Sequence, residues 1–184
     1  MSYIIAKTEN LLTEKELIDV EKHIINSLGF EWFKRIVSVD TDKTTPWFSH
    51  PLVSRPEKSK NLTSTLDSPF AKFFMRMVER MCEQNDIEFE KFYRGNLNCT
   101  LSNSKEKFFT KPHTDHKFKH KNFLLYLTDC SGDTVFFDKD NLNDPIHSES
   151  PKKNKAIIFE GDIPHTHKPC KGNEERIICV FTFI

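Results

Sequence analysis

The sequence lacks the features that define several classes of protein. Its five cysteines are odd in number and include no CxxC pair, which argues against a disulfide framework and is typical of reduced thiols in a cytosol. No apolar stretch approaches the length of a membrane span, and the chain does not open with a basic segment followed by an apolar run. We therefore expect an intracellular, cytoplasmic protein that has no membrane partner.

The chain also lacks net charge, because 27 basic residues balance 27 acidic ones, so no overall field attracts nucleic acid. Phenylalanine is abundant instead: its 17 residues supply rigid apolar bulk suited to the inside of a small barrel. The length of 184 residues predicts one domain, residues 1–184, in which residues 1–86 supply helical support and substrate loops and residues 87–184 form a β-rich core.

The first half of the chain predicts two amphipathic helices. Thr13 and Glu16 form a capping-box pattern before apolar residues at helical spacing, which predicts a helix over about residues 14–27. A second helix is expected to begin at Ser68, with an apolar stripe from Phe70 to Met81. Between them, residues 32–39 resemble a strand, and the polar residues 40–65 are expected to form either a substrate lid or a plain surface loop.

The second half consists of short β-rich runs separated by turns. The expected strands are residues 87–101, 123–128, 134–138, 155–160 and 176–184. Helices first and strands second indicate an α+β fold, with the helices packed on one face of a curled sheet.

The pattern that carries chemistry is His113-Thr114-Asp115, followed by His165 fifty positions after Asp115 and by Arg176 eleven positions after His165. Alternate side chains of a β-strand point the same way, so His113 and Asp115 can bind one ion. Two imidazoles and one carboxylate on one face of an octahedral ion leave three positions open, as in non-haem Fe(II) oxygenases. We therefore predict His113, Asp115 and His165 as metal ligands and catalytic residues.

The surroundings of these residues resemble a known family. The matching features are His-Thr-Asp at 113–115, Tyr-Leu-Thr at 126–128, the turn and strand start at 131–134, Gly161 with His165, and an Arg before the last strand. Over about residues 90–184 they resemble the 2-oxoglutarate/Fe(II)-dependent dioxygenases, specifically the prolyl-4-hydroxylase-like branch and its small microbial or phage-type members. The resemblance implies a double-stranded β-helix (a cupin-like jelly roll) whose major sheet is braced by the N-terminal helices.

The resemblance also implies Fe(II) as metal, 2-oxoglutarate and O2 as co-substrates, and ascorbate as a stimulant. Arg176 would meet the far carboxylate of 2-oxoglutarate, because a guanidinium can pair with a buried carboxylate through two parallel hydrogen bonds. Tyr126 would reach the same carboxylate. Leu124 lies two residues before Tyr126 on the same strand, so its side chain would point the same way and line this pocket. Thr134 and Phe136 would line the pocket from the next strand.

His167 competes with His165 for the role of second imidazole. The two lie two positions apart, so both can face the same way, and the resemblance permits either spacing to Arg176. Gly161 four positions earlier and the preceding Pro164 favour His165. A structural zinc site of His165, His167 and Cys170 is a further alternative, weakened because it would leave the 113–115 motif unexplained. The remaining His116, His120 and His147 are interpreted as surface residues.

The implied reaction is hydroxylation of an unactivated C–H bond, coupled to decarboxylation of 2-oxoglutarate to succinate. Asp115 argues against a halogenase, in which a small residue replaces the carboxylate. We expect a protein or peptide substrate, most simply a prolyl one. Two alternatives stay open: an AlkB-like nucleobase demethylase, although Thr182 stands where that branch has a second Arg, and a non-catalytic jelly-roll module for interaction or iron sensing.

Overall fold

The computed structural model describes residues 3–37, 43–56, 64–101, 107–108 and 110–184. Its elements are, in chain order, β1 (Ile4–Thr8), α1 (Glu14–Val20), the π-helical turn η1 (Glu21–Ile25), β2 (Phe33–Val37), β3 (Lys43–Val53), α2 (Ala71–Gln84), β4 (Phe92–Leu101), β5 (Lys121–Tyr126), β6 (Thr134–Asp138), β7 (Asn141–Glu149), β8 (Ala156–Glu160), β9 (His165–His167) and β10 (Glu175–Phe183).

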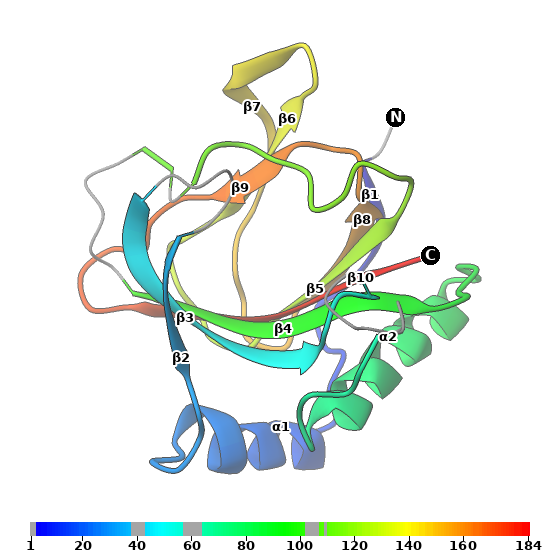
Figure 1. Cartoon of the computed structure of the whole chain (residues 1–184), viewed down its shortest axis with the longest axis vertical. Coiled ribbons are helices and arrows are strands. Elements are labelled where there is room, and N and C mark those ends of the chain that lie inside the picture. Colours follow the sequence, from blue (N-terminus) through cyan, green and yellow to red (C-terminus); the bar gives the residue numbers. More distant parts are fainter. Residues whose placement is uncertain (1–2, 38–42, 57–63, 102–106, 109) are drawn as a thin grey trace.

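Two antiparallel sheets form the body of the molecule (Figure 1). The larger has the strand order β1-β8-β5-β10-β4-β3-β2, and the smaller has the order β7-β6-β9. Both helices lie beyond the larger sheet, on the side away from the smaller one. This is the expected α+β architecture of a double-stranded β-helix with helices bracing the major sheet, although the two sheets do not close on each other.

The capping box at the start of α1 is present as predicted. The backbone N–H of Glu16 donates to the Thr13 hydroxyl, and the Glu16 carboxylate accepts from the Thr13 backbone N–H. The same carboxylate accepts from both terminal nitrogens of Arg80 on α2, at 2.7 and 2.9 Å. The helical segment ends near the predicted boundary, but its last turn is wound as η1.

Helix α2 buries the predicted apolar stripe against the larger sheet. Phe74, Met77, Val78 and Met81 are at most 1% exposed and belong to one core cluster with residues of β4, β5, β8 and β10. Of the described helices, none is long and apolar enough to span a membrane.

The interpretation of residues 40–65 as a loop is wrong for residues 43–53. Residues 43–53 form β3, which pairs with β2 on one side and β4 on the other. The prolines suggested a loop, yet Pro51 sits where the register with β4 shifts, one of the places where a sheet tolerates proline. Residues 40–42 and 57–63 of that segment lie outside the described residues.

Candidate active site

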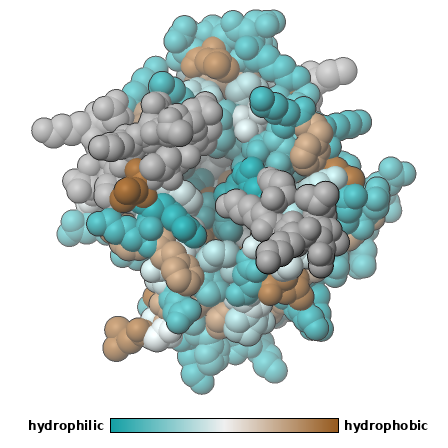
Figure 2. Space-filling view, in the orientation of Figure 1, coloured by the Kyte–Doolittle hydropathy of each residue, from teal (hydrophilic) through white to brown (hydrophobic). Residues whose placement is uncertain are grey.

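A cavity of about 780 Å³ opens between the two sheets, and most of the predicted site residues line it. Figure 2 shows the face viewed in Figure 1 as mostly hydrophilic and hollowed near its middle. The lining includes the predicted metal donors His113, Asp115 and His165, and it also includes Arg176 and Thr134, while Leu124 contributes apolar surface.

The backbone brings His113 and His165 together. Each residue's N–H donates to the other's carbonyl, at 3.1 and 2.9 Å, which makes a short antiparallel bridge between the 113–115 segment and β9. The imidazole centroids are 5.2 Å apart. In each ring Nδ1 bonds a backbone carbonyl two residues earlier, Lys111 or Ile163, at 3.0 Å. Nδ1 therefore carries a proton in both rings, which leaves Nε2 as the nitrogen that a metal ion would bind.

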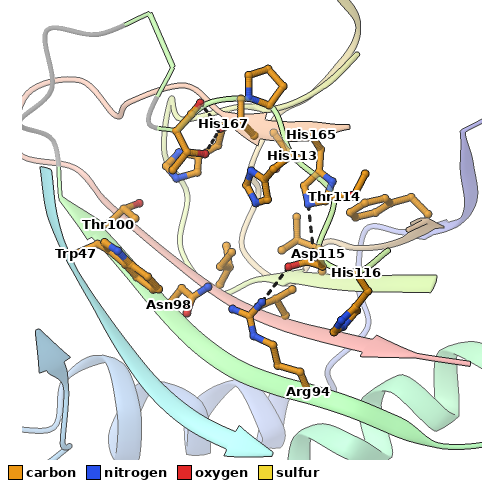
Figure 3. A pocket seen from close by; sticks show the side chains of 18 of the residues that line it. Trp47, Arg94, Asn98, Thr100, His113, Thr114, Asp115, His116, His165 and His167 are labelled. Atoms are coloured by element: carbon orange, nitrogen blue, oxygen red, sulfur yellow. Dashed lines mark hydrogen bonds and ion pairs between the residues drawn. The ribbon is translucent and has the colours of Figure 1, made fainter. Parts of the chain in front are cut away.

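Asp115 points toward the same place (Figure 3). Its Oδ2 lies 3.5 Å from Nε2 of His165 and accepts from the Asn122 amide at 3.1 Å, while its Oδ1 accepts from Arg94 at 2.9 Å. Burial alone would raise the pKa of this carboxyl, but the His165 hydrogen bond and the charge of Arg94 outweigh it and hold the pKa well below normal. Asp115 is thus a carboxylate at neutral pH.

The local backbone differs from the expectation of a strand. His113 makes only the isolated bridge to His165, and Asp115 lies in an irregular segment, so tertiary contacts rather than strand alternation aim the two side chains. Among the described side chains, no three His, Cys, Asp or Glu residues already have coordinating geometry. The Asp115 carboxylate is hydrogen-bonded to Arg94 and Asn122 instead. The donor set itself, two imidazoles and a carboxylate, suits Fe(II).

Arg176 is a buried cation that lines the same cavity. It is 3% exposed; its Nε donates to the Gly132 carbonyl at 3.0 Å and one Nη donates to the Thr134 hydroxyl at 2.8 Å. That hydroxyl also bonds the Tyr126 hydroxyl at 2.8 Å, and the guanidinium carbon lies 5.7 Å from the Tyr126 ring centroid. No carboxylate within the described part of the chain forms an ion pair with Arg176, so its charge invites an anionic ligand.

Leu124 and His167 complete the arrangement predicted around Arg176. Leu124 packs in a small apolar cluster with Tyr126 and Phe136. His167 lies on β9 and lines the cavity, with its Nδ1 bonded to the Lys168 carbonyl at 2.9 Å. Burial, with the charge of Arg176, lowers its pKa well below the usual value, so this imidazole is neutral.

Sequence reasoning missed Arg94 and three polar residues on the wall of the cavity. Trp47 Nε1, Asn98 Oδ1 and Thr100 Oγ1 are buried atoms that have no hydrogen-bond partner among the described residues, and all three residues line the cavity. Figure 3 shows them beside one another along β3 and β4, across from the histidines. A buried polar atom without a partner is costly, so three together indicate a place where a ligand binds.

Two of the three histidines interpreted as surface residues lie inward. His120 is 2% exposed, and its ring packs against Gly161. A Cβ at position 161 would lie only 2.3 Å from the nearest atom of this ring, so glycine is the residue that fits there. His116 lines the cavity, and its Nε2 bonds the Thr182 hydroxyl at 2.8 Å. Burial, with the charge of His120, lowers the pKa of His116 to about 4. His147 is exposed, as expected.

Comparison with known proteins agrees with this geometry. Residues 98–183 match the family model of the 2OG-Fe(II) oxygenase superfamily. No curated protein matches the sequence. Among solved structures, a 2OG-Fe(II) oxygenase family oxidoreductase from Burkholderia pseudomallei has a TM-score of 0.71 at 13% identity, covering 94% of this chain and 80% of that one.

Two further structures share the fold at low identity. The epimerase SnoN of nogalamycin biosynthesis, solved with Fe3+, alpha ketoglutarate and nogalamycin RO, has a TM-score of 0.61 at 11% identity, covering 97% of this chain and 78% of that one. A prolyl hydroxylase from Trichoplax adhaerens, solved with a hypoxia inducible factor peptide fragment, has a TM-score of 0.62 at 12% identity, covering 97% of this chain and 82% of that one.

The strand order and the shared structures define a jelly-roll fold. The family match over residues 98–183, together with the shared fold, supports a 2-oxoglutarate-dependent dioxygenase of the 2OG-Fe(II) oxygenase superfamily. The metal and co-substrates of that superfamily are Fe(II), 2-oxoglutarate and O2, and the SnoN structure holds iron and alpha ketoglutarate.

Proposed function

We propose that this chain hydroxylates an unactivated C–H bond of a peptidyl substrate, most simply a prolyl residue. The observation that carries the proposal is that one cavity is lined both by the His113, His165 and Asp115 donors and by the buried Arg176, which pairs with no carboxylate of the described residues. The donors suit a metal ion, and Arg176 suits the far carboxylate of a dicarboxylic co-substrate.

In this proposal His113 and His165 bind the metal through Nε2, and Asp115 binds through its carboxylate. When bound, Fe(II) with 2-oxoglutarate and O2 supplies the oxidising power for hydroxylation, coupled to decarboxylation of 2-oxoglutarate to succinate. The protein orients the ligands: the Lys111 and Ile163 carbonyls fix the two rings, and Arg94 and Asn122 fix the carboxylate.

Arg176 binds the far carboxylate of 2-oxoglutarate. Thr134 and Tyr126 hold the guanidinium in place and offer hydroxyls to the same carboxylate, while Leu124 shields the carbon chain from water. The raised pKa of Tyr126, caused by burial, keeps its hydroxyl protonated and able to donate. Ascorbate is expected to stimulate turnover by keeping the metal reduced.

The polar row of Trp47, Asn98 and Thr100 supports a substrate that carries an amide. An indole N–H donates, an amide oxygen accepts and a hydroxyl does either, which matches the acceptor and donor of one peptide unit. The prolyl hydroxylase that shares this fold was solved with a peptide. Hydrogen bonds to the peptide backbone would orient the substrate whatever its side chains.

Succinate release in the presence of Fe(II), O2 and 2-oxoglutarate tests the proposal. We expect release to increase when proline-containing peptides are added, with an oxygen atom added to the peptide by mass spectrometry, and to disappear in Asp115→Ala. Stimulation by methylated nucleotides alone would favour the AlkB-like alternative. If no succinate were released with any metal or substrate added, and 2-oxoglutarate failed to bind, a non-catalytic module would be favoured instead.

A further inference from the structure

Two cysteines that the oxygenase chemistry does not use lie side by side behind Arg176. Cys130 is in the turn between β5 and β6, and Cys170 is in the turn between β9 and β10. A Cβ at Gly132, two residues after Cys130, would lie 2.8 Å from the Cys170 sulfur, so the two turns meet at the cysteines. A hydrogen bond between the Cys130 and Cys170 side chains is consistent with this arrangement. Cys170 is buried and Cys130 is partly exposed, so an oxidant in solution can reach one member of the pair.

Glu174 holds the two turns together beside the cysteines. Its carboxylate accepts from the backbone N–H and the hydroxyl of Ser131, at 2.9 and 2.5 Å, and from the backbone N–H of Lys171 at 3.3 Å. The Lys171 N–H also donates to the Ser131 hydroxyl at 2.9 Å. Because Ser131 follows Cys130 and Lys171 follows Cys170, this clamp fixes the backbone on which both sulfurs depend. The clamp therefore keeps the two cysteine-bearing turns together.

The two thiols differ in reactivity. The hydrogen bond from Cys170, helped by a backbone N–H and the charge of Arg176, lowers the pKa of Cys130, whereas the same hydrogen bond and burial raise the pKa of Cys170. The charge of Arg176 lowers the pKa of both thiols and the charge of Glu174 raises the pKa of both, so neither charge changes which thiol has the lower pKa. A thiolate beside a protonated thiol is the arrangement of an attacking and a resolving cysteine.

The other cysteines are poor competitors. Cys82, Cys99 and Cys179 are buried, and burial raises the pKa of each, to about 11 for Cys82 and about 12 for Cys99. A buried thiol with a raised pKa reacts slowly with an oxidant. In the described part of the chain, Cys130 and Cys170 are therefore the pair that an oxidant would find reactive.

We infer that Cys130 and Cys170 form a reversible, peroxide-oxidised disulfide, a modification site next to the 2-oxoglutarate anchor. The Cys130 thiolate attacks hydrogen peroxide, the O–O bond breaks, and Cys130 becomes a sulfenic acid while hydroxide leaves and takes up a proton as water. The Cys170 sulfur then displaces the sulfenic oxygen, which leaves as a second water. The two sulfurs lose two electrons in all, and peroxide gains them.

The disulfide would change the surroundings of Arg176. Gly132, two residues after Cys130, accepts the Nε hydrogen bond of Arg176, and a Cβ at position 132 would lie 2.8 Å from the Cys170 sulfur and 3.2 Å from Cδ of Arg176. Oxidation removes the negative charge of the Cys130 thiolate from this crowded place. Arg176 then has one fewer anion competing with the co-substrate, so we expect 2-oxoglutarate to bind roughly 3- to 10-fold more tightly to the oxidised protein.

The modification is tested on metal-free, full-length protein treated with hydrogen peroxide, because bound iron would itself react with the oxidant. We expect the intact mass to fall by the mass of two hydrogen atoms and to recover when dithiothreitol is added. A proteolytic map of the oxidised protein should show the peptides that contain Cys130 and Cys170 joined to each other. Cys170→Ser should leave a sulfenic acid at Cys130 that a 1,3-diketone traps. Cys130→Ser should give neither product, and Cys82→Ser, the matched control, should behave as the unmodified protein.

Absence of the cross-link in folded protein, or equal oxidation of Cys82, Cys99 or Cys179, would overturn the inference. The consequence for Arg176 rests on the proposed function and is tested separately, by calorimetric titration of 2-oxoglutarate into Mn(II)-loaded protein before and after oxidation. Unchanged affinity would overturn the link to the anchor. If 2-oxoglutarate bound to neither form, the proposed function would fail, while the mass and trapping results would still decide whether the disulfide forms.

Discussion

His113 and His165 are backbone hydrogen-bond partners, although one lies before β5 and the other in β9. The two bonds, 2.9 and 3.1 Å long, set the distance between the imidazoles before any ligand arrives. Each ring is then fixed by a carbonyl of its own segment. A site held by backbone contacts loses little conformational entropy on binding a metal, which favours tight binding.

Arg176→Ala is expected to raise the KM for 2-oxoglutarate by roughly 10- to 100-fold, because the far carboxylate loses its charged partner. Arg176→Lys should recover only part of the loss, since an ammonium cannot make two parallel hydrogen bonds. Iron affinity should be unchanged in both variants, whereas Asp115→Ala should lose iron and turnover together. Steady-state kinetics and metal titration provide the measurements, and equal loss of iron affinity in the Arg176 and Asp115 variants would contradict these roles.

Arg94→Met should weaken Fe(II) binding by roughly 10- to 100-fold, because the carboxylate of Asp115 loses the hydrogen bond that orients it. Methionine keeps much of the apolar stem and removes the charge. Lys117→Met, which removes an exposed cation that lines the same cavity, is the matched control and should bind iron normally. Metal titration that found both variants equally affected would indicate a general field effect rather than positioning of Asp115.

Trp47→Phe tests the polar row. The substitution removes the unpartnered indole N–H and keeps an aromatic ring, so the KM for a peptide substrate should rise several-fold while 2-oxoglutarate affinity and uncoupled succinate release stay the same. Thr100→Val, which removes a hydroxyl from the same wall, should act in the same direction. If either variant reduced 2-oxoglutarate affinity instead, the row would belong to the co-substrate.

Glu16→Gln should lower the free energy of unfolding at neutral pH by about 1 kcal/mol, because it weakens the capping box and removes the ion pair that joins α1 to α2. The hydrogen bond with Arg80 lowers the pKa of Glu16 from 4.5 to about 2, despite partial burial. The stabilisation is therefore present above about pH 4.5 and is lost as the pH falls toward 2.

Urea unfolding at pH 7 and pH 3 should accordingly show a smaller difference between Glu16→Gln and the unmodified protein at the lower pH. Glu14→Gln, an exposed change in the same first turn, is the control and should have a small effect at both values. A difference that did not shrink on acidification would contradict the assigned ion pair.

The sequence predicted the second half of the fold better than the first. Periodicity and turn residues indicated β5, β6, β8 and β10 because these strands are strongly apolar, and β4 because its buried residues largely alternate. It missed β3 and β7, which are polar strands that contain proline, and the short β1 and β9. Such strands are defined by their pairing partners rather than by local preference.

The site residues that sequence indicated are those whose residue type is chemically distinctive. His113, Asp115, His165 and Arg176 were predicted and line one cavity. Arg94 was not, because nothing local distinguishes an Arg on a strand from a surface residue until β4 brings it to Asp115. Trp47, Asn98 and Thr100 were likewise invisible, since their significance is the lack of a partner in three dimensions. Whether His165 or His167 binds the metal stays a prediction, because both face the cavity.

The most direct test of the account is an anaerobic titration of Fe(II) and 2-oxoglutarate that follows the weak visible charge-transfer band formed when the keto acid chelates iron. The account predicts this band in the unmodified protein and in His167→Ala, and its loss in His165→Ala. A band that survived in His165→Ala and disappeared in His167→Ala would reverse the ligand assignment. No band in the unmodified, folded protein would contradict the proposed iron and co-substrate site.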